Sequence, residues 1–292
     1  MSDIWTILMP VLRFAFYPAM LLAVGGIIFS MMMVRHLGQD MRGYTGRVTR
    51  RAAIAGACLT ALQVPAAAGN LAGDMAGMLD PVLIGIMLEA PTGAAAIMGL
   101  AGFLLILLAE WFVQDPVHPA RITGPGIVIL SLALSGHATT GGLLTAGLLV
   151  VHLAGLGIWM GGLLPLRAMS RAPGQYGGLP ALAGTAEAFG RLAGWSVALL
   201  VAAGGVYAAQ LLGSFTALLT TAYGNLLLMK IGLVGGLLGL AAYNRWRLTP
   251  RLQAGNHDAA RRLGHLISLE LLAVLAILVV TGLMTSSVGL PV

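Results

Sequence analysis

The chain has 292 residues, of which 58% are hydrophobic and only 9% are charged, whereas a soluble domain carries about 25% charged side chains. This composition and the mean hydropathy of +0.92 exclude an ordinary water-soluble globule. Apolar stretches of roughly 20 residues have the length that a helix needs to cross the hydrocarbon of a bilayer. The sequence therefore predicts an all-α, polytopic transmembrane helical bundle that forms one membrane domain over residues 1–292.

Apolar runs and the residues that interrupt them predict eight helices. The first run is expected to be a retained helix, because the N-terminal segment lacks the basic leader of a secretory signal. In chain order the predicted helices cover residues 10–34, 52–70, 91–113, 122–138, 143–166, 192–213, 222–244 and 264–287.

The positions of the basic residues indicate how these helices cross the membrane. The formal net charge is +6, from 16 Lys and Arg against 10 Asp and Glu. If alternate loops face the cytoplasm, those loops hold 14 of the 16 basic residues, and only Arg13 and Lys230 lie inside predicted helices. The positive-inside rule then makes both termini periplasmic, and we expect the loop charges to contact anionic membrane lipid rather than nucleic acid. The 14 loop residues are Arg35, Arg42, Arg47, Arg50, Arg51, Arg121, Arg167, Arg171, Arg191, Arg245, Arg247, Arg251, Arg261 and Arg262.

A weak internal repeat divides the predicted bundle into two halves of four helices, about 10–138 and about 143–288. The halves are expected to be parallel, because an even number of spans separates each matching pair. The matching elements are Gly25 and Gly26 with Gly161 and Gly162, and 90–93 (APTG) with 221–224 (TAYG).

Two histidines in the predicted spans are candidate metal ligands. His137 lies about one turn inside the outer end of its helix, and His152 lies near the bilayer midplane in the next helix. The short turn between these helices makes them antiparallel neighbours, so the two imidazoles can approach one another. Neutral imidazoles suit copper, and Cu(I) in particular accepts low coordination numbers. For each histidine alone, a hydrogen bond between helices is the alternative. In the first half, Phe16 occupies the position that corresponds to His152.

Methionines near the outer surface could collect a soft ion before it enters the membrane. Met75 and Met78 are three residues apart in the polar segment 73–80 (GDMAGMLD), and Met284 lies near the outer end of the last predicted helix. The alternative for the segment is a short interfacial helix in which methionine forms the buried stripe.

Three further residues are candidates for a gate or a relay. Lys230 and Glu270 are intramembrane charges on consecutive predicted helices, at depths that would require long side chains or a bridging water for a direct pair. They could form an ion-pair network that holds the bundle together, or a proton or ion relay. Trp159 is seven positions after His152 on nearly the same helix face, where it could form the floor of a cavity.

The sequence offers no chemistry of other common kinds. Cys58 is the only cysteine, which excludes an internal disulfide and a CxxC motif. No nucleotide-binding loop, Ser/His/Asp set or HExxH motif occurs, so the sequence does not predict an enzyme.

Several segments of the second half together resemble a known family. Residues 135–138 (SGHA), 152–166 (HLAGLGIWMGGLLPL) and 223–230 (YGNLLLMK), with Asn244 and Glu270, are similar to the CopD family of bacterial copper-resistance and copper-uptake membrane proteins. The resemblance is strongest from about 120 to 288. It implies an eight-helix inner-membrane protein that moves copper toward the cytoplasm, often with CopC, a small periplasmic copper-binding protein that is expected here to be a separate chain. The family's histidine positions fall at His137 and His152 in this sequence.

The main hypothesis is a copper permease in which outer methionines collect the ion and pass it to His137 and His152. The alternative is a membrane electron carrier that binds b-type haem through transmembrane histidines. A third interpretation is a copper sensor or assembly scaffold that binds the ion without moving it.

Overall fold

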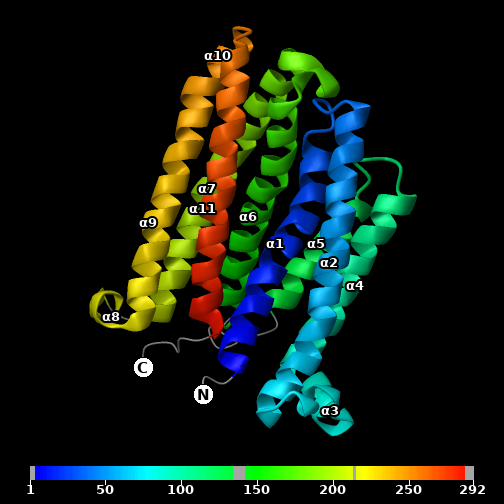
Figure 1. Cartoon of the computed structure of the whole chain (residues 1–292), viewed down its shortest axis with the longest axis vertical. Coiled ribbons are helices and arrows are strands. Elements are labelled where there is room, and N and C mark those ends of the chain that lie inside the picture. The colour runs from blue at the N-terminus through cyan, green and yellow to red at the C-terminus, as the bar shows by residue number, and fades with distance from the viewer. Residues whose placement is uncertain (1–3, 134–141, 213–214, 287–292) are drawn as a thin grey trace.

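The computed structural model describes residues 4–133, 142–212 and 215–286. These residues are mostly helical and contain no strand. The long helices stand side by side in one bundle, and short helices lie at its two ends (Figure 1). The long helices are α1 (Trp5–Met32), α2 (Gln39–Ala72), α4 (Pro91–Phe112), α5 (Ala120–Ala133), α6 (Gly142–Arg171), α7 (Gly178–Leu212), α9 (Ala222–Tyr243) and α11 (His257–Ser286); the short ones are η1 (Ala76–Leu79), α3 (Pro81–Glu89), η3 (Pro173–Tyr176), α8 (Phe215–Thr220), η4 (Asn244–Leu248) and α10 (Thr249–Gln253).

Each of the eight predicted helices overlaps one of these long helices. Of the described helices, seven are long and apolar enough to cross a membrane. The predicted span 122–138 corresponds to α5, which is described over the 14 residues from Ala120 to Ala133 and is shorter than the other seven.

Two helices begin well before the predicted positions. α2 starts at Gln39 and α7 at Gly178, against the predicted starts at 52 and 192. The added turns of α2 carry four arginines, and those of α7 contain glycine, proline, Glu187 and Arg191, which interrupt the apolar run. A helix can continue into the headgroup region, where its polar side chains are hydrated.

The centre of the bundle is α1, which packs against α2, α5, α6 and α11. α1 and α6 come into backbone contact through glycines: a Cβ added at Gly161 would lie 2.1 Å from the carbonyl oxygen of Gly25, and one added at Gly25 would lie 2.0 Å from that of Gly157. Only residues without a side chain permit this approach. The glycines next to them face the following helix in each half, since Gly26 lies against Thr49 of α2 and Gly162 lies against Phe189 of α7.

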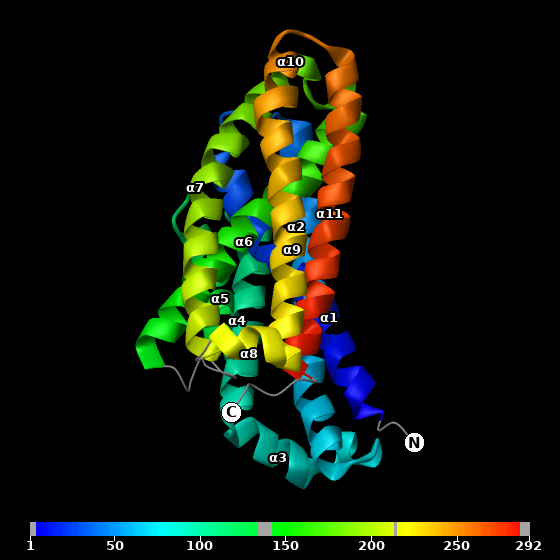
Figure 2. The ribbon, with the colours of Figure 1, turned by 90° about the vertical axis from the view of Figure 1, so that its left-hand side faces the viewer.

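The two ends of the bundle differ in charge. α10 and the connections from α1 to α2 and from α6 to α7 lie at one end, whereas α3, α8, the start of α1 and the last described turn of α11 lie at the other (Figures 1 and 2). The first end carries most of the arginines and is called the basic end below. Exposed Trp111, Phe112 and Trp246 lie toward it, as expected for aromatic side chains at a membrane interface.

Candidate functional site

His152 is held by a backbone group of the neighbouring helix. It is partly buried on α6, about 15 Å along the helix axis from Gly142. Its Nδ1 lies 3.2 Å from the carbonyl oxygen of Leu200 on α7. In the neutral tautomer that donates from Nδ1, the lone pair of Nε2 remains available for a metal ion. Metal-binding histidines commonly have their second ring nitrogen fixed in this way.

Glycines on both helices make this approach possible. A Cβ added at Gly204 of α7 would lie 3.0 Å from both Cε1 and Nδ1 of His152. A Cβ added at Gly155 of α6 would lie 3.1 Å from the carbonyl oxygen of Ser196. The imidazole therefore occupies space that an ordinary residue at 204 would take.

The predicted partner of His152, His137, lies outside the described residues. The described parts of α5 and α6 pack against each other, as expected for neighbouring helices. The contacts described for the His152 ring come instead from α7, which the sequence did not indicate as a partner. A backbone carbonyl leaves no signal in the sequence, although the Gly204–Gly205 pair marks a point of close approach.

Lys230 of α9 lies near His152 rather than near Glu270. The lysine is close enough for its charge to act on the imidazole. Among the described residues no direct ion pair joins Lys230 to Glu270. Glu270 contacts Asn244, which is 14 residues and about 21 Å beyond Lys230 along α9 and its extension, so the two charges lie at different depths.

Glu270 belongs to a buried polar network near the basic end. Asn244 donates from Nδ2 to Glu270 Oε1 at 2.5 Å, and the indole of Trp159 also hydrogen-bonds the Glu270 side chain. All three side chains are buried. Asn244 opens the π-helical turn η4, and its Oδ1 is buried without a partner. The Glu270 carboxyl group is thus held by neutral donors only, and the amide oxygen of its partner Asn244 is unpaired.

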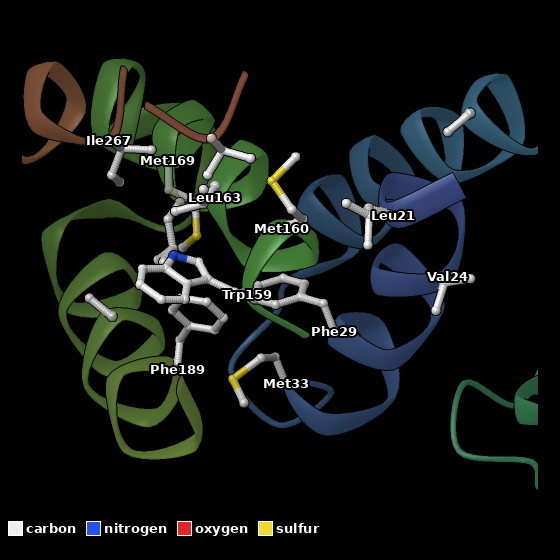
Figure 3. Packing of buried hydrophobic residues seen from close by; sticks show 14 of the residues in the cluster. Leu21, Val24, Phe29, Met33, Trp159, Met160, Leu163, Met169, Phe189 and Ile267 are labelled. Atoms are coloured by element: carbon white, nitrogen blue, oxygen red, sulfur yellow. The ribbon is translucent and has the colours of Figure 1, made fainter. Parts of the chain in front are cut away.

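Trp159 is buried where α6 packs against α7 (Figure 3). Its indole packs on Phe189, and the sulfur-bearing side chains of Met33 and Met169 lie close to the same cluster (Figure 3). The sequence correctly predicted that Trp159 faces the interior. The hydrogen bond between Trp159 and Glu270 depends on a contact between α6 and α11, which the sequence does not reveal.

The three outer methionines do not converge on one point. Met75 is 52% exposed. Met78 packs in a small cluster with Trp5 and Ala66, whereas Met284 is buried in a different cluster with Tyr223. The 3-10 turn η1 turns Met78 back onto the bundle, so Met75 and Met78 do not share an exposed helical face.

In the described part of the chain, no group of three or more His, Cys, Asp or Glu side chains is arranged to hold a metal ion. A cation at His152 would need ligands of other kinds, such as a thioether, a carbonyl oxygen or a residue outside the described ranges.

Comparison with known families gives two matches. Residues 1–146 match the family described as Copper resistance protein D-like, N-terminal domain, and residues 183–284 match the family described as Copper resistance protein D. The comparisons with curated proteins and with solved structures gave no match.

Proposed function

Because the chain belongs to the copper resistance protein D (CopD) family, we propose that it transports copper across the bacterial inner membrane, from the periplasm to the cytoplasm. The observation that carries the proposal is the environment of His152. A carbonyl oxygen orients its Nδ1, a glycine makes room for the ring, and the lone pair of Nε2 is left for a metal ion. This is the arrangement that a neutral histidine needs to act as a ligand.

The proposed direction rests on the distribution of charge. The basic end faces the cytoplasm under the positive-inside rule, which makes both termini periplasmic. The opposite end carries Asp74, Asp80 and Glu89 in the segment from η1 to α3. A cation would therefore meet acidic groups first, and we expect a separate CopC-like protein to deliver copper at this end.

We assign the entry role to Met75, with Met78 and Met284 as further thioethers on the outer side. Met75 is exposed, so its sulfur is open to a soft ion. Met78 and Met284 would take part only if their packing against the bundle loosened. Thioether and imidazole ligands together favour Cu(I) as the transported ion.

The membrane site then consists of His152 and, as its predicted second imidazole, His137. Lys230 acts as an electrostatic gate, because its ammonium group and a copper ion at His152 repel each other. A copper ion is therefore held most tightly when Lys230 is neutral or turned away. Replacement of Lys230 by Met is expected to tighten copper binding at His152.

Glu270 is proposed as the inner relay, with Trp159 as the closed barrier before it. Trp159 lies about 10 Å beyond His152 along α6. The Glu270 carboxyl is held by Asn244 and Trp159, and no cationic side chain pairs with it among the described residues. Such a group can accept a proton or compensate a passing cation.

The 4+4 repeat is supported by the way the mirrored glycines pack. Gly25 and Gly161 meet at the contact between α1 and α6, while Gly26 and Gly162 each face the second helix of their own half. Two related halves in contact through their first helices would have this arrangement.

The decisive experiment compares the parent with a His137→Ala, His152→Ala double variant and with His257→Ala, an exposed histidine outside the proposed path. Copper bound to the purified protein and copper taken up by expressing cells are both measured. We expect the double variant to lose both and His257→Ala to retain both. A folded, membrane-inserted double variant that binds and accumulates copper like the parent would contradict the proposal.

The optical spectrum of the same preparations tests the haem alternative. A Soret band after expression with ample haem would favour a haem-binding electron carrier. Copper binding without flux into liposomes would indicate a sensor or scaffold instead of a transporter.

A further inference from the structure

A cavity lies at the basic end, away from His152. It has a volume of about 360 Å³ and lies between the start of α2, the end of α4 and the start of α5. Four arginines and one carboxylate line it: Arg42, Arg47 and Arg50 from α2, Arg121 from α5 and Glu110 from α4. None of these residues belongs to the proposed copper path.

Arg121 is built into the wall of this cavity. It is 7% exposed, pairs with Glu110, and donates from one terminal nitrogen to the carbonyl oxygens of Ala109 at 3.3 Å and Val113 at 2.9 Å. These bonds satisfy carbonyls at the end of α4. The three hydrogen bonds of the terminal nitrogens use three of the five N–H donors of the guanidinium, and its buried Nε has no partner.

The charge in the cavity is strongly unbalanced. Glu110 neutralises one arginine, and Arg42, Arg47 and Arg50 take part in no ion pair among the described residues. Four positive charges against one negative charge leave an excess of three around one small volume. Like charges around one cavity repel each other. An anion that accepts hydrogen bonds from several N–H groups would relieve this repulsion.

The cavity lies at the depth of lipid headgroups. Glu110 is followed directly by the exposed Trp111 and Phe112, and aromatic side chains of this kind mark the membrane interface. Basic pockets between transmembrane helices on the cytoplasmic side are suited to phosphate-bearing headgroups.

We propose that the cavity formed by Arg42, Arg47, Arg50 and Arg121 is a binding site for a phosphate-bearing anion. The anion is either the headgroup of an anionic lipid or free phosphate, and in both cases the arginines of α2 bind its oxygens while the buried Arg121 adds positive charge at the wall of the cavity. The same positive charge excludes copper ions from this side of the bundle, so the site is separate from the transport path.

The test uses the purified full-length protein in a neutral detergent, with two probes: phosphatidylglycerol and inorganic phosphate. Binding is followed by native mass spectrometry across a titration of each probe. The variant Arg47→Gln, Arg50→Gln removes two lining charges and leaves the Arg121–Glu110 pair intact. Its matched control is Arg247→Gln, Arg251→Gln, which removes the same charge from exposed positions of η4 and α10 at the same end.

Loss of two charge-assisted contacts is expected to weaken binding by about tenfold or more in the first variant, with little change in the control. Saturation by phosphatidylglycerol alone identifies the lipid headgroup as the ligand, and saturation by both probes identifies the phosphate group itself. Equal weakening in both variants would show general attraction to a basic surface and would overturn the proposal. Saturable binding of neither probe would overturn it as well.

A second variant tests the site without removing any arginine. A Cβ added at Gly43 would lie 3.5 Å from a terminal nitrogen of Arg47, so Gly43→Asp places a carboxylate within the cavity. Because a non-glycine residue is tolerated in a helix at this open position, the variant is expected to fold. It should compete with the anion and lower binding about as much as the double variant. Undiminished binding in Gly43→Asp would contradict the proposed location.

Discussion

The contact between Gly204 and His152 gives the sharpest test of the proposed copper site. In Gly204→Ala the new methyl group would lie 3.0 Å from Cε1 and Nδ1 of His152, whereas carbon atoms in comfortable contact are about 3.5–4.0 Å apart. The ring must therefore move away from α7 by about 0.5 Å. The perturbation reaches the proposed ligand without replacing it.

This movement of the ring also breaks the hydrogen bond between His152 Nδ1 and the carbonyl oxygen of Leu200, which orients the ring. Leu200 and Gly204 are one turn apart on the same face of α7, so a ring pushed away from one moves away from the other. The distance from Nδ1 to the Leu200 carbonyl, 3.2 Å in the parent, would rise to about 3.7 Å, beyond the range of a hydrogen bond. Loss of such an orienting partner lowers metal affinity about 10- to 100-fold.

The assay is a competition titration of the purified protein with a Cu(I) chelator, and the control is Gly205→Ala. A Cβ at Gly205 meets no atom within 4 Å, and both substitutions remove a helical glycine, which by itself favours folding by roughly 0.5–1 kcal/mol. We expect Gly205→Ala to bind copper like the parent and Gly204→Ala to bind it more weakly. If both variants match the parent while remaining folded, His152 is not a copper ligand in the orientation described.

Three other substitutions test the packing, the relay and the buried ion pair. In Gly161→Ala the new Cβ would lie 2.1 Å from the carbonyl oxygen of Gly25, so α1 and α6 must separate, and we expect a loss of about 1–3 kcal/mol in the free energy of unfolding. Glu270→Gln keeps the size of the side chain but removes its charge, and copper flux into liposomes is expected to fall at unchanged copper affinity. Arg121→Gln removes the cation that pairs with Glu110, but Arg42, Arg47 and Arg50 remain around the same cavity. We therefore expect a loss of stability below the about 3–5 kcal/mol of an isolated buried pair, which thermal unfolding in detergent would detect.

Two of these three substitutions have a matched control variant. Gly235→Ala, where a Cβ meets nothing within 4 Å, should leave stability unchanged or slightly higher. The double variant Glu110→Gln, Arg121→Gln removes both charges and should be more stable than Arg121→Gln alone. Parental flux in Glu270→Gln would remove the carboxylate from the transport mechanism, and parental stability in Gly161→Ala would contradict the tight contact between α1 and α6.

The fold could be predicted from the sequence as far as the hydrophobic runs reach. Each predicted helix overlaps a described one, because hydrocarbon thickness fixes the length of the apolar segment. The starts of α2 and α7 could not be predicted in this way, since charged residues, glycine or proline interrupt the apolar run there although Met41 and Leu182 still pack into the core. Within the segment from Gly73 to Asp80, the residues Ala76–Leu79 form a 3-10 turn that packs back against α2.

The candidate site was predictable only where a side chain carries the signal. His152 and Glu270 were identifiable because polar groups in a span are costly. Their partners were not: His152 faces a backbone carbonyl of α7, and Glu270 faces Asn244 and Trp159 rather than Lys230. The depth of each residue along its helix separates Lys230 from Glu270. The actual partners depend on which helices pack together. Tertiary contacts such as the glycine contacts between α1 and α6 determine this packing.

The two halves, if related as we infer, have taken different chemical roles. In the first half, Phe16 is buried and packs edge to face on Phe103, with ring centroids 6.3 Å apart, where the second half has His152. Glu110 links the last two long helices of the first half through an ion pair with Arg121, whereas Glu270 links those of the second half through neutral donors.

A cation that entered the first half would therefore meet an aromatic cluster with no ligand and then the excess positive charge beside Arg121. A cation in the second half would meet an oriented imidazole and, about 10 Å further along α6, Trp159, whose indole bonds a Glu270 carboxyl group that no cation compensates among the described residues. Since the lower barrier for a positive ion lies where ligands and uncompensated negative charge occur in sequence, the second half is the one suited to carry the ion. In the proposed mechanism the first half then supports α6 through the contact between α1 and α6.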